Sequence, residues 1–284
     1  MATAILNQIA QPERTVDARP DASGRLNPSD LRVTFPRVIR SEWVKFRSLQ
    51  SNWITLISTV LLVLGFGAIA SATFNADPSD PDAFSNPITV GLAGNLFAQI
   101  VIGILGVLVI TSEFASGMIR STFAAVPTRL PVLGAKAIVV AGVTLVVALP
   151  TMFGAFFLGQ AIIGGDSASL TDSGVLRVIV GSAGYLAAVA LLGLGLGTIV
   201  RQAAGAIGIV FVLLLLAPQL LGFLLPTSAQ ETFLRYLPSN AGSAITAIDS
   251  NPALLSPLMG VIVLAGWVVG FLGIAAVLLK RRDA

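Results

Sequence analysis

Long runs of apolar residues recur six times along the chain, separated by shorter polar segments. Each run has about the 20 residues that a helix needs to cross a bilayer, and none carries a charged residue near its middle. The six runs cover residues 53–73, 88–111, 132–159, 175–200, 203–225 and 257–279. This pattern predicts an all-α, polytopic membrane protein with six transmembrane helices.

The polar flanks set the limits of this membrane domain. Residues 1–30 have scattered Arg, Asp, Pro and Gly and no apolar period, which predicts a disordered cytoplasmic tail before a six-span domain at residues 31–284. The first apolar run begins near Trp53, too far along for a cleaved signal peptide, so we expect it to be a retained span. Only residues 200–202 separate the fourth and fifth runs, which predicts a tight helical hairpin.

Lys and Arg are distributed unevenly between the two sides of the predicted bundle. Eight precede the first span, three lie between the second and third, one lies between the fourth and fifth, and three follow the last. Fifteen of the seventeen basic residues therefore lie on one side, which predicts that both termini are cytoplasmic. Lys136 and Arg177 lie near span ends, where we expect long side chains to snorkel toward the interface.

The segment at residues 31–50 has the pattern of an N-terminal interfacial helix. Large apolar side chains recur about every four residues, at Phe35, Ile39, Trp43 and Phe46. Basic side chains fall largely on other faces, at Arg37, Arg40, Lys45 and Arg47. Such a helix would lie on an anionic cytoplasmic leaflet and contact membrane lipid. The alternative is a basic flank that only enforces the orientation of the first span.

The connection at residues 111–136 is the longest cytoplasmic link between predicted spans. Its candidate partner-contacting residues are Glu113, Gly117, Arg120 and Arg129. The first three are spaced by four and three residues, which favours one helical face. Pro127 and Pro131 should end the helix before the third span begins. The segment is therefore predicted to be a short protruding helix and a rigid turn, either a docking surface or an ordinary loop with a chance Glu–Arg pair.

The connection at residues 226–256 lies on the opposite side of the bundle. Its stretch ETFLRYLPSNAGSAI is too apolar for a loop that is surrounded by water. We expect short helices that lie at the outer leaflet or dip into it, and the alternative is a loop that is apolar by chance.

Glycines crowd the fourth span and the start of the fifth. Gly193 and Gly197 form a small-xxx-small pair, which allows two helices to approach closely. Packing within the chain is the simpler interpretation, and a dimer face is the alternative.

The composition excludes several kinds of catalytic and binding site. The chain is 55% hydrophobic and 11% charged, and the absence of cysteine and histidine excludes disulfides, thiolate catalysis and a histidine base. No phosphate-binding GxxxxGK[ST] string occurs. The polar residues inside the spans are small hydroxyls and four amides, at Asn95, Gln99, Gln160 and Gln219. We therefore expect no catalytic site, cofactor or metal on this chain, and no intramembrane charge that could couple an ion gradient.

Three stretches together suggest a known family. In EFASGMIRSTFAAVPTRLPVLGAKA, from Glu113, an acidic residue, a glycine and an arginine precede a proline-marked turn and a lysine. The other two stretches are RSEWVKFRSLQSNW, from Arg40, and YLPSNAGSAI, from Tyr236. They resemble, in order, the segment between spans two and three, the amphipathic first helix and the outer re-entrant region of the membrane permease of ABC exporters of the second type. The resemblance covers residues 31–284 in layout.

The resemblance implies a function and partners. Two six-span permeases would pair, as a homodimer or a related heterodimer, and each would contact a separate ABC ATPase subunit that binds ATP and magnesium. The segment with Glu113, Gly117, Arg120 and Arg129 would be the coupling helix. The expected location is the bacterial plasma membrane, and no nucleic acid is expected as a partner. Charge-free spans favour a hydrophobic or amphipathic cargo, such as a lipid, drug-like compound or peptide.

Other functions stay open on sequence alone. A secondary carrier or channel would need internal repeats, broken helices or mid-membrane charges, which the sequence does not show. An intramembrane serine protease would need a base for its serine, and there is no histidine. An accessory or immunity membrane protein without transport of its own is not excluded.

Overall fold

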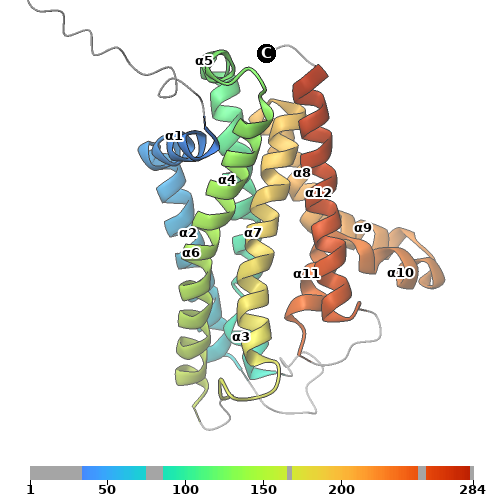
Figure 1. Cartoon of the computed structure of the whole chain (residues 1–284). Helices are drawn as coiled ribbons and strands as arrows, with labels where there is room; N and C mark the ends of the chain where they lie inside the picture. Colours follow the sequence, from blue (N-terminus) through green and yellow to red (C-terminus); the bar gives the residue numbers. More distant parts are fainter. Residues whose placement is uncertain (1–33, 75–85, 165–167, 249–253, 282–284) are drawn as a thin grey trace, which may run out of the picture. The chain divides into compact units, whose positions relative to one another are not determined.

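The computed structural model describes residues 34–74, 86–164, 168–248 and 254–281, so the predicted tail at 1–30 lies outside the described residues. Within this part of the chain, six helices are long and apolar enough to cross a membrane. They are α2 (Gln50–Ala72), α4 (Asn95–Ala115), α6 (Leu130–Ile163), α7 (Val175–Val200), the run from α8 to α9 (Ala203–Leu224) and α12 (Pro257–Arg281). The all-α, six-span prediction is confirmed (Figure 1).

Two spans differ from their predicted limits. The second is divided into a short helix α3 (Pro87–Gly91) and α4, because the Asn86 side chain accepts a hydrogen bond from the Ile88 N–H and starts a separate helix. The third is longer than predicted, since α6 has 34 residues and continues through Pro150. α4 also continues beyond residue 111, so Glu113 belongs to the span helix rather than to the connection.

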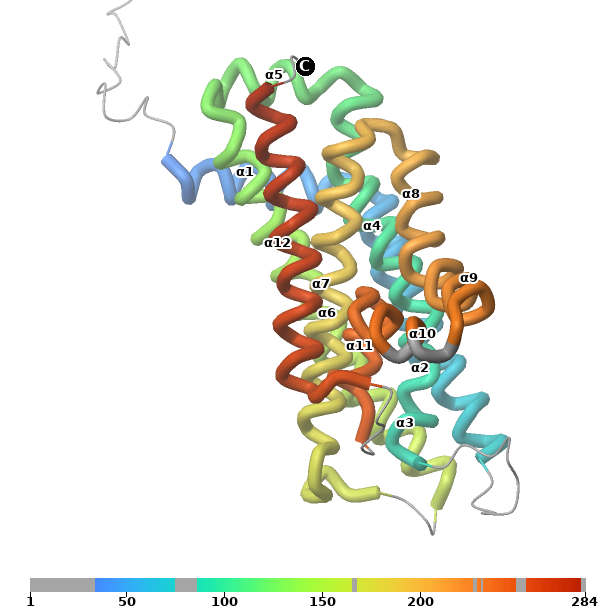
Figure 2. The backbone as a smooth tube through the Cα atoms, turned by 90° about the vertical axis from the view of Figure 1, so that its right-hand side faces the viewer, coloured from blue at the N-terminus to red at the C-terminus, as the bar shows by residue number. Residues whose placement is uncertain are grey.

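The fifth span is one run of helix with an irregular middle. α8 (Ala203–Phe211) passes into a π-helical turn η2 (Val212–Leu216) and then into α9 (Ala217–Leu224), which has Pro218 in its first turn. Proline lacks an N–H and cannot close the usual hydrogen bond to the preceding turn, so an irregular turn before it is expected. Figures 1 and 2 show α9 turning away from the bundle axis after this point.

Helix α7 is the centre of the bundle. It packs against α4, α6, α8, α11 and α12 (Figure 2). In the most apolar stretch of α7, 61% of the residues are buried, against 11% in the α8–α9 run and in α12. The last two spans are therefore the ones with the most side-chain surface left for lipid or protein.

Small residues let α4 and α7 approach closely. A Cβ atom on Gly193 would overlap the carbonyl of Gly103, and one on Gly197 would press against the Val107 backbone. The small-xxx-small pair therefore serves packing within the chain, the simpler of the two predicted uses.

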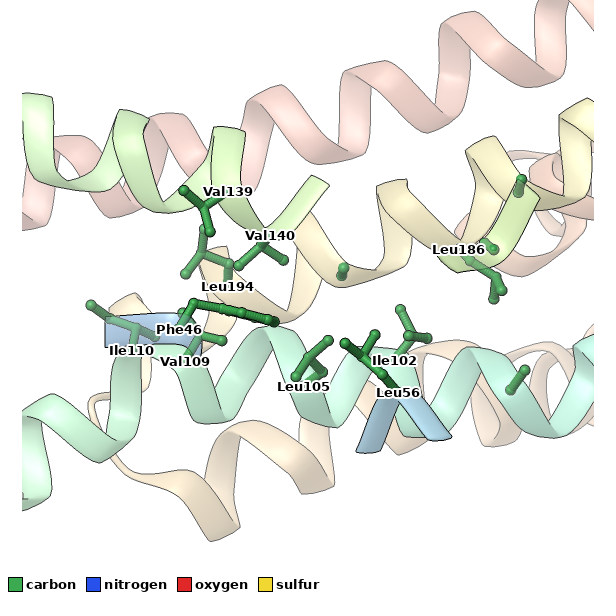
Figure 3. Packing of buried hydrophobic residues seen from close by; sticks show 14 of the residues in the cluster. Phe46, Leu56, Ile102, Leu105, Val109, Ile110, Val139, Val140, Leu186 and Leu194 are labelled. Carbon is green, nitrogen blue, oxygen red and sulfur yellow. The ribbon is translucent and has the colours of Figure 1, made fainter. Parts of the chain in front are cut away.

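The main core lies between α4, α6 and α7, and two other helices reach into it. Figure 3 shows Phe46 of α1 and Leu56 of α2 lying against side chains of these helices. The labelled residues of the three core helices are Ile102, Leu105, Val109, Ile110, Val139, Val140, Leu186 and Leu194. The burial of Phe46, only 2% exposed, shows that α1 belongs to the folded unit Phe35–Ala284.

Helix α1 (Phe35–Ser48) meets α2 at a sharp corner (Figure 1). Leu49 is extended, and two side chains of α2 donate hydrogen bonds to the last carbonyl groups of α1. Asn52 Nδ2 lies 2.9 Å from the Phe46 carbonyl oxygen, and Trp53 Nε1 lies 3.0 Å from that of Arg47. These bonds satisfy helix-end carbonyls that would otherwise lack partners, and they fix the angle of the corner.

Short helices form in the described part of the 226–256 connection, as the sequence predicts, and their position at the outer leaflet stays a prediction. They are α10 (Thr227–Phe233), η3 (Leu234–Tyr236) and α11 (Pro238–Thr246). α11 packs against α7 and α12. Arg177 of α7, which was expected to snorkel, instead donates hydrogen bonds to the carbonyl oxygens of Ile245 and Ala247, at 2.9 and 2.8 Å. The guanidinium thus satisfies the C-terminal carbonyls of α11, where a cation is favourable.

Candidate functional site

A short helix, α5 (Met118–Ala125), crosses one end of the bundle between α4 and α6 (Figure 1). It ends before Pro127, and Pro131 lies in the first turn of α6. The predicted protruding helix and proline-marked turn are therefore confirmed.

Gly117 separates α4 from α5. Its φ of 72° is left-handed, which a residue with a side chain adopts only at a cost. The predicted common helical face of Glu113, Gly117 and Arg120 is wrong, because Glu113 lies on α4 and Arg120 on α5, with this reversal between them. The glycine forms the corner between the two helices, and its contact with a partner stays a prediction.

Below this corner lies a buried ionic cluster of four residues, Glu42, Lys45, Glu113 and Lys136. Lys136 Nζ of α6 lies 2.5 Å from Glu42 Oε2 and 2.6 Å from Glu113 Oε1. Lys45 Nζ lies 2.7 Å from Glu42 Oε1 and 3.2 Å from Glu113 Oε1. Glu42, Glu113 and Lys136 are each 2–3% exposed. Two carboxylates and two ammonium groups thus join α1, α4 and α6 without net charge.

Lys45 extends the ionic cluster to α5. Its Nζ donates a third hydrogen bond, of 3.0 Å, to Thr122 Oγ1. Burial acts to lower the pKa of Lys45, but the hydrogen bonds and negative charges of Glu42 and Glu113 outweigh burial and raise it above 10.5. Lys45 is therefore a cation throughout the physiological range, and α5 is tied to the cluster by a charged donor.

A small cavity of about 200 Å³ adjoins the ionic cluster and is lined mainly by α1, α4 and α6. Two buried atoms there have no hydrogen-bond partner among the described residues, Glu113 Oε2 and Ser112 Oγ. A cavity of this size has room for water beside both atoms.

The two predicted arginines differ in their surroundings. The Arg120 side chain is exposed on α5, and no ion pair to it is found within the described part of the chain. Arg129 has a φ of 55° and precedes α6. Its guanidinium donates to the Leu279 carbonyl oxygen at 3.0 Å and lies over the Phe123 ring. Arg129 therefore ties the turn after α5 to the last turn of α12, whereas the Arg120 side chain is exposed on the surface of α5.

The predicted interfacial residues divide between two faces of α1. Val38, Glu42 and Phe46 face the bundle and are buried, with Lys45 partly covered. The remaining predicted residues, Arg40, Trp43 and Arg47, are exposed. The expectation that Phe46 would share a lipid-facing stripe with Trp43 is therefore wrong, because Phe46 fills the core. The placement of α1 at a membrane surface stays a prediction.

Sequence reasoning missed half of the ionic cluster. Glu42 was not singled out, although it lies four residues from both Val38 and Phe46 on the buried face. Lys136 was expected to snorkel, but it is 2% exposed and paired with two carboxylates. The available signal was a single charge in each of two apolar helix ends, Glu113 and Lys136, because buried charges need partners of opposite sign.

The comparisons identify the family. A family model described as "ABC-2 family transporter protein" matches residues 38–217, which run from the first turn of α1 to the first residue of α9 and include the whole ionic cluster and α5. No curated protein matches the chain. With more than half of its length matched and six membrane-spanning helices in place, the chain belongs to the ABC-2 family of transporter permeases.

Proposed function

We propose that the chain is the permease subunit of an ATP-driven exporter that moves a hydrophobic or amphipathic cargo out of the cytoplasm. ATP and magnesium would bind to a separate ABC ATPase subunit, and two permease copies, or two related permeases, would form the pore. The family membership supports the permease role. The α5 end of the bundle would face the cytoplasm, in agreement with the distribution of basic residues.

One observation carries this proposal: the exposed helix α5 is mechanically tied to the spans. It continues from α4 at Gly117 and is bonded to Lys45 of α1 through Thr122. The glutamates that bind Lys45 also bind Lys136 of α6, and Arg129 reaches α12. A displacement of α5 by a partner would therefore act on three spans and on α1 together. Glu113, Gly117, Arg120 and Arg129 would be the coupling residues, with Arg120 in contact with the ATPase.

The chemistry of the ionic cluster suits such a joint. Charged hydrogen bonds are directional, and removing one partner of a buried pair costs several kcal/mol, about 3–5. Helices held by such charged bonds therefore separate less readily than helices in apolar contact, which can slide past each other. Arg120 has a planar guanidinium that can bind a carboxylate on a partner with two parallel hydrogen bonds.

Photo-crosslinking tests the contact directly. A benzophenone maleimide is attached to Ser121→Cys on α5 or, as a control, to Ser169→Cys at the other end of the bundle; the chain has no native cysteine. In membranes that also contain the co-encoded ATPase subunit, we expect an adduct from position 121 and none from position 169. Adducts from both positions, or from position 169 alone, would contradict the proposed contact.

A second measurement separates a permease from an accessory protein. The purified chain alone should not hydrolyse ATP, and ATP-dependent efflux from vesicles should require both subunits. Efflux that proceeds without the ATPase subunit would contradict the exporter and favour a secondary carrier. A permease and ATPase that never co-purify would favour an accessory role.

A further inference from the structure

A second polar site lies in the half of the bundle away from α5. It is a cavity of about 360 Å³ between the start of α4, the middle of α7, the irregular middle of the fifth span and α11. Its polar lining residues are Asn95, Gln99, Tyr185, Gln219, Ser239, Asn240, Ser243 and Thr246. Three of the four amide residues inside the predicted spans thus meet at one place, which their separation along the chain hides.

The cavity is polar but uncharged. All its described polar lining residues are amides, hydroxyls and one phenol, and none is Asp, Glu, Lys or Arg. In hydrocarbon, an amide or hydroxyl without a hydrogen-bond partner costs free energy, so a cluster of them among the spans indicates a ligand or another polar partner. Amides and hydroxyls both donate and accept, which suits a neutral ligand that carries amide or hydroxyl groups.

Part of this polar set is structural and part of it is available. The Tyr185 hydroxyl donates to Gln99 Oε1, and Gln99 Nε2 donates to the Leu96 carbonyl, so this pair braces α7 against α4. In contrast, Asn95 Oδ1 and Ser239 Oγ are buried atoms without a hydrogen-bond partner among the described residues. One acceptor, on α4, and one hydroxyl, on α11, therefore remain for a ligand.

The fifth span is irregular at this cavity. Leu214 and Leu215 belong to the π-helical turn, and Pro218 and Gln219 follow it in α9; all four line the cavity. π-helical turns are rare and occur often at functional sites, because they displace side chains from the regular helical positions. The wall formed by α8, η2 and α9 is also among the least buried of the spans, so it can move with little loss of packing.

We propose that this cavity binds the neutral, hydrogen-bonding part of the cargo, through Asn95, Ser239 and the exposed amide of Gln219. The ligand is an amphipathic molecule whose polar part carries amide or hydroxyl groups without charge, and whose apolar part lies against Leu214, Leu215 and Pro218. This assignment rests on the proposed exporter function, because only an exporter would make the bound molecule its cargo. Binding of the molecule to the cavity does not need the ATPase.

Single cysteines test the chemistry of the cavity. Ser243→Cys lines the cavity, and Ser169→Cys in an exposed turn gives the intrinsic reactivity of each reagent. In lipid nanodiscs, the neutral reagent 2-hydroxyethyl methanethiosulfonate should modify Cys at 243 faster, relative to position 169, than the trimethylammonium or the sulfonate analogue does. Equal relative rates for all three reagents would mean an open aqueous cleft and would overturn the proposal.

Protection tests the ligand class. N-octanoyl-N-methylglucamine carries an amide, hydroxyls and an apolar chain, and below its micellar concentration it should slow the modification at position 243 in a saturable way. n-Octyltrimethylammonium, with the same chain length and no hydrogen-bond donor, should not. Asn95→Leu should weaken the protection about fivefold, the effect of one lost hydrogen bond, and Ser239→Ala should act in the same direction if Asn95→Leu fails to fold. Protection that is absent, or unchanged in both variants, would overturn the proposal.

The same probe distinguishes this proposal from the exporter function. If the permease–ATPase complex transports but N-octanoyl-N-methylglucamine protects nothing, the cavity assignment fails and the exporter stands. If protection is found and depends on Asn95, the cavity assignment stands whether or not the ATPase responds.

Discussion

The two polar sites of this bundle differ in charge and in completeness. The ionic cluster around Lys136 is largely buried and has no net charge, and among the described residues only one of its carboxylate oxygens, Glu113 Oε2, has no partner. The cavity at Asn95 and Ser239 is uncharged and larger, and it leaves buried acceptors free on two walls. A closed set of charged bonds holds helices together, whereas an open set of neutral groups can bind something else. This contrast supports the two proposals, that one end of the bundle transmits force and that the other binds the cargo.

The comparison depends first on which end faces the cytoplasm. A membrane-impermeant maleimide should label Ser169→Cys in intact cells and should label Thr128→Cys, in the turn after α5, only after the cells are opened. Both residues are exposed, so accessibility of the side chain is not limiting. Labelling of position 128 but not 169 in intact cells would reverse the orientation and would place the α5 end outside.

The largest effect of a single substitution on stability is expected at the ionic cluster. Lys136→Met removes the buried one of the two cations that Glu42 and Glu113 share and leaves them only the partly exposed Lys45, which should lower the free energy of unfolding by about 3–5 kcal/mol. The measurement is the amount of folded protein and its melting temperature in detergent. In a double-mutant cycle, Glu42→Gln combined with Lys136→Met should cost clearly less than the sum of the two single changes. Additive losses would show that these groups do not form one cluster.

The cavity should respond in the opposite way. Asn95→Leu removes a buried acceptor that has no partner among the described residues, so the melting temperature should stay the same or rise. Gln99→Leu is the matched control, because it removes the acceptor of the Tyr185 hydroxyl and should destabilise by about 1–3 kcal/mol. If Asn95→Leu destabilises the protein as much as Gln99→Leu does, Asn95 is structural and the contrast between the sites is lost.

The smallest effect is the pH dependence of the Lys45 bonds. The pKa of Lys45 is raised in the folded protein, so its contribution to stability is fully present below the unfolded value of about 10.5 and is lost as pH rises through the folded value. The difference in melting temperature between the wild type and Lys45→Gln should therefore be constant from about pH 7 to 9.5 and should narrow above about pH 10.5. A difference that changes near neutral pH would show that another group of the cluster titrates there.

The sequence predicts the spans well because burial in lipid leaves long apolar runs that need no tertiary information. It also predicts α5, since Pro127 and Pro131 act locally on the backbone. The pairing of the ionic cluster and the cavity could not be predicted for one reason: their members are far apart in the chain. Glu42 and Lys136 are 94 residues apart, and Tyr185 and Gln99 are 86 apart. In the sequence, a single charge or amide near a helix end indicates only that its burial would cost free energy. Whether a partner offsets that cost depends on how the helices pack.

The measurement that tests the account most directly compares Arg120→Ala with Arg281→Ala in vesicles that contain permease and ATPase in known amounts. Both arginines are exposed, on α5 and on the last turn of α12, so neither change should alter protein abundance by more than the small effect of a surface substitution. We expect transport per permease and cargo-stimulated ATP hydrolysis to fall in Arg120→Ala and to stay at the wild-type level in Arg281→Ala. Normal transport and normal ATPase stimulation in Arg120→Ala, and likewise in Glu113→Ala and Arg129→Ala after correction for abundance, would contradict the role of α5 as the coupling element.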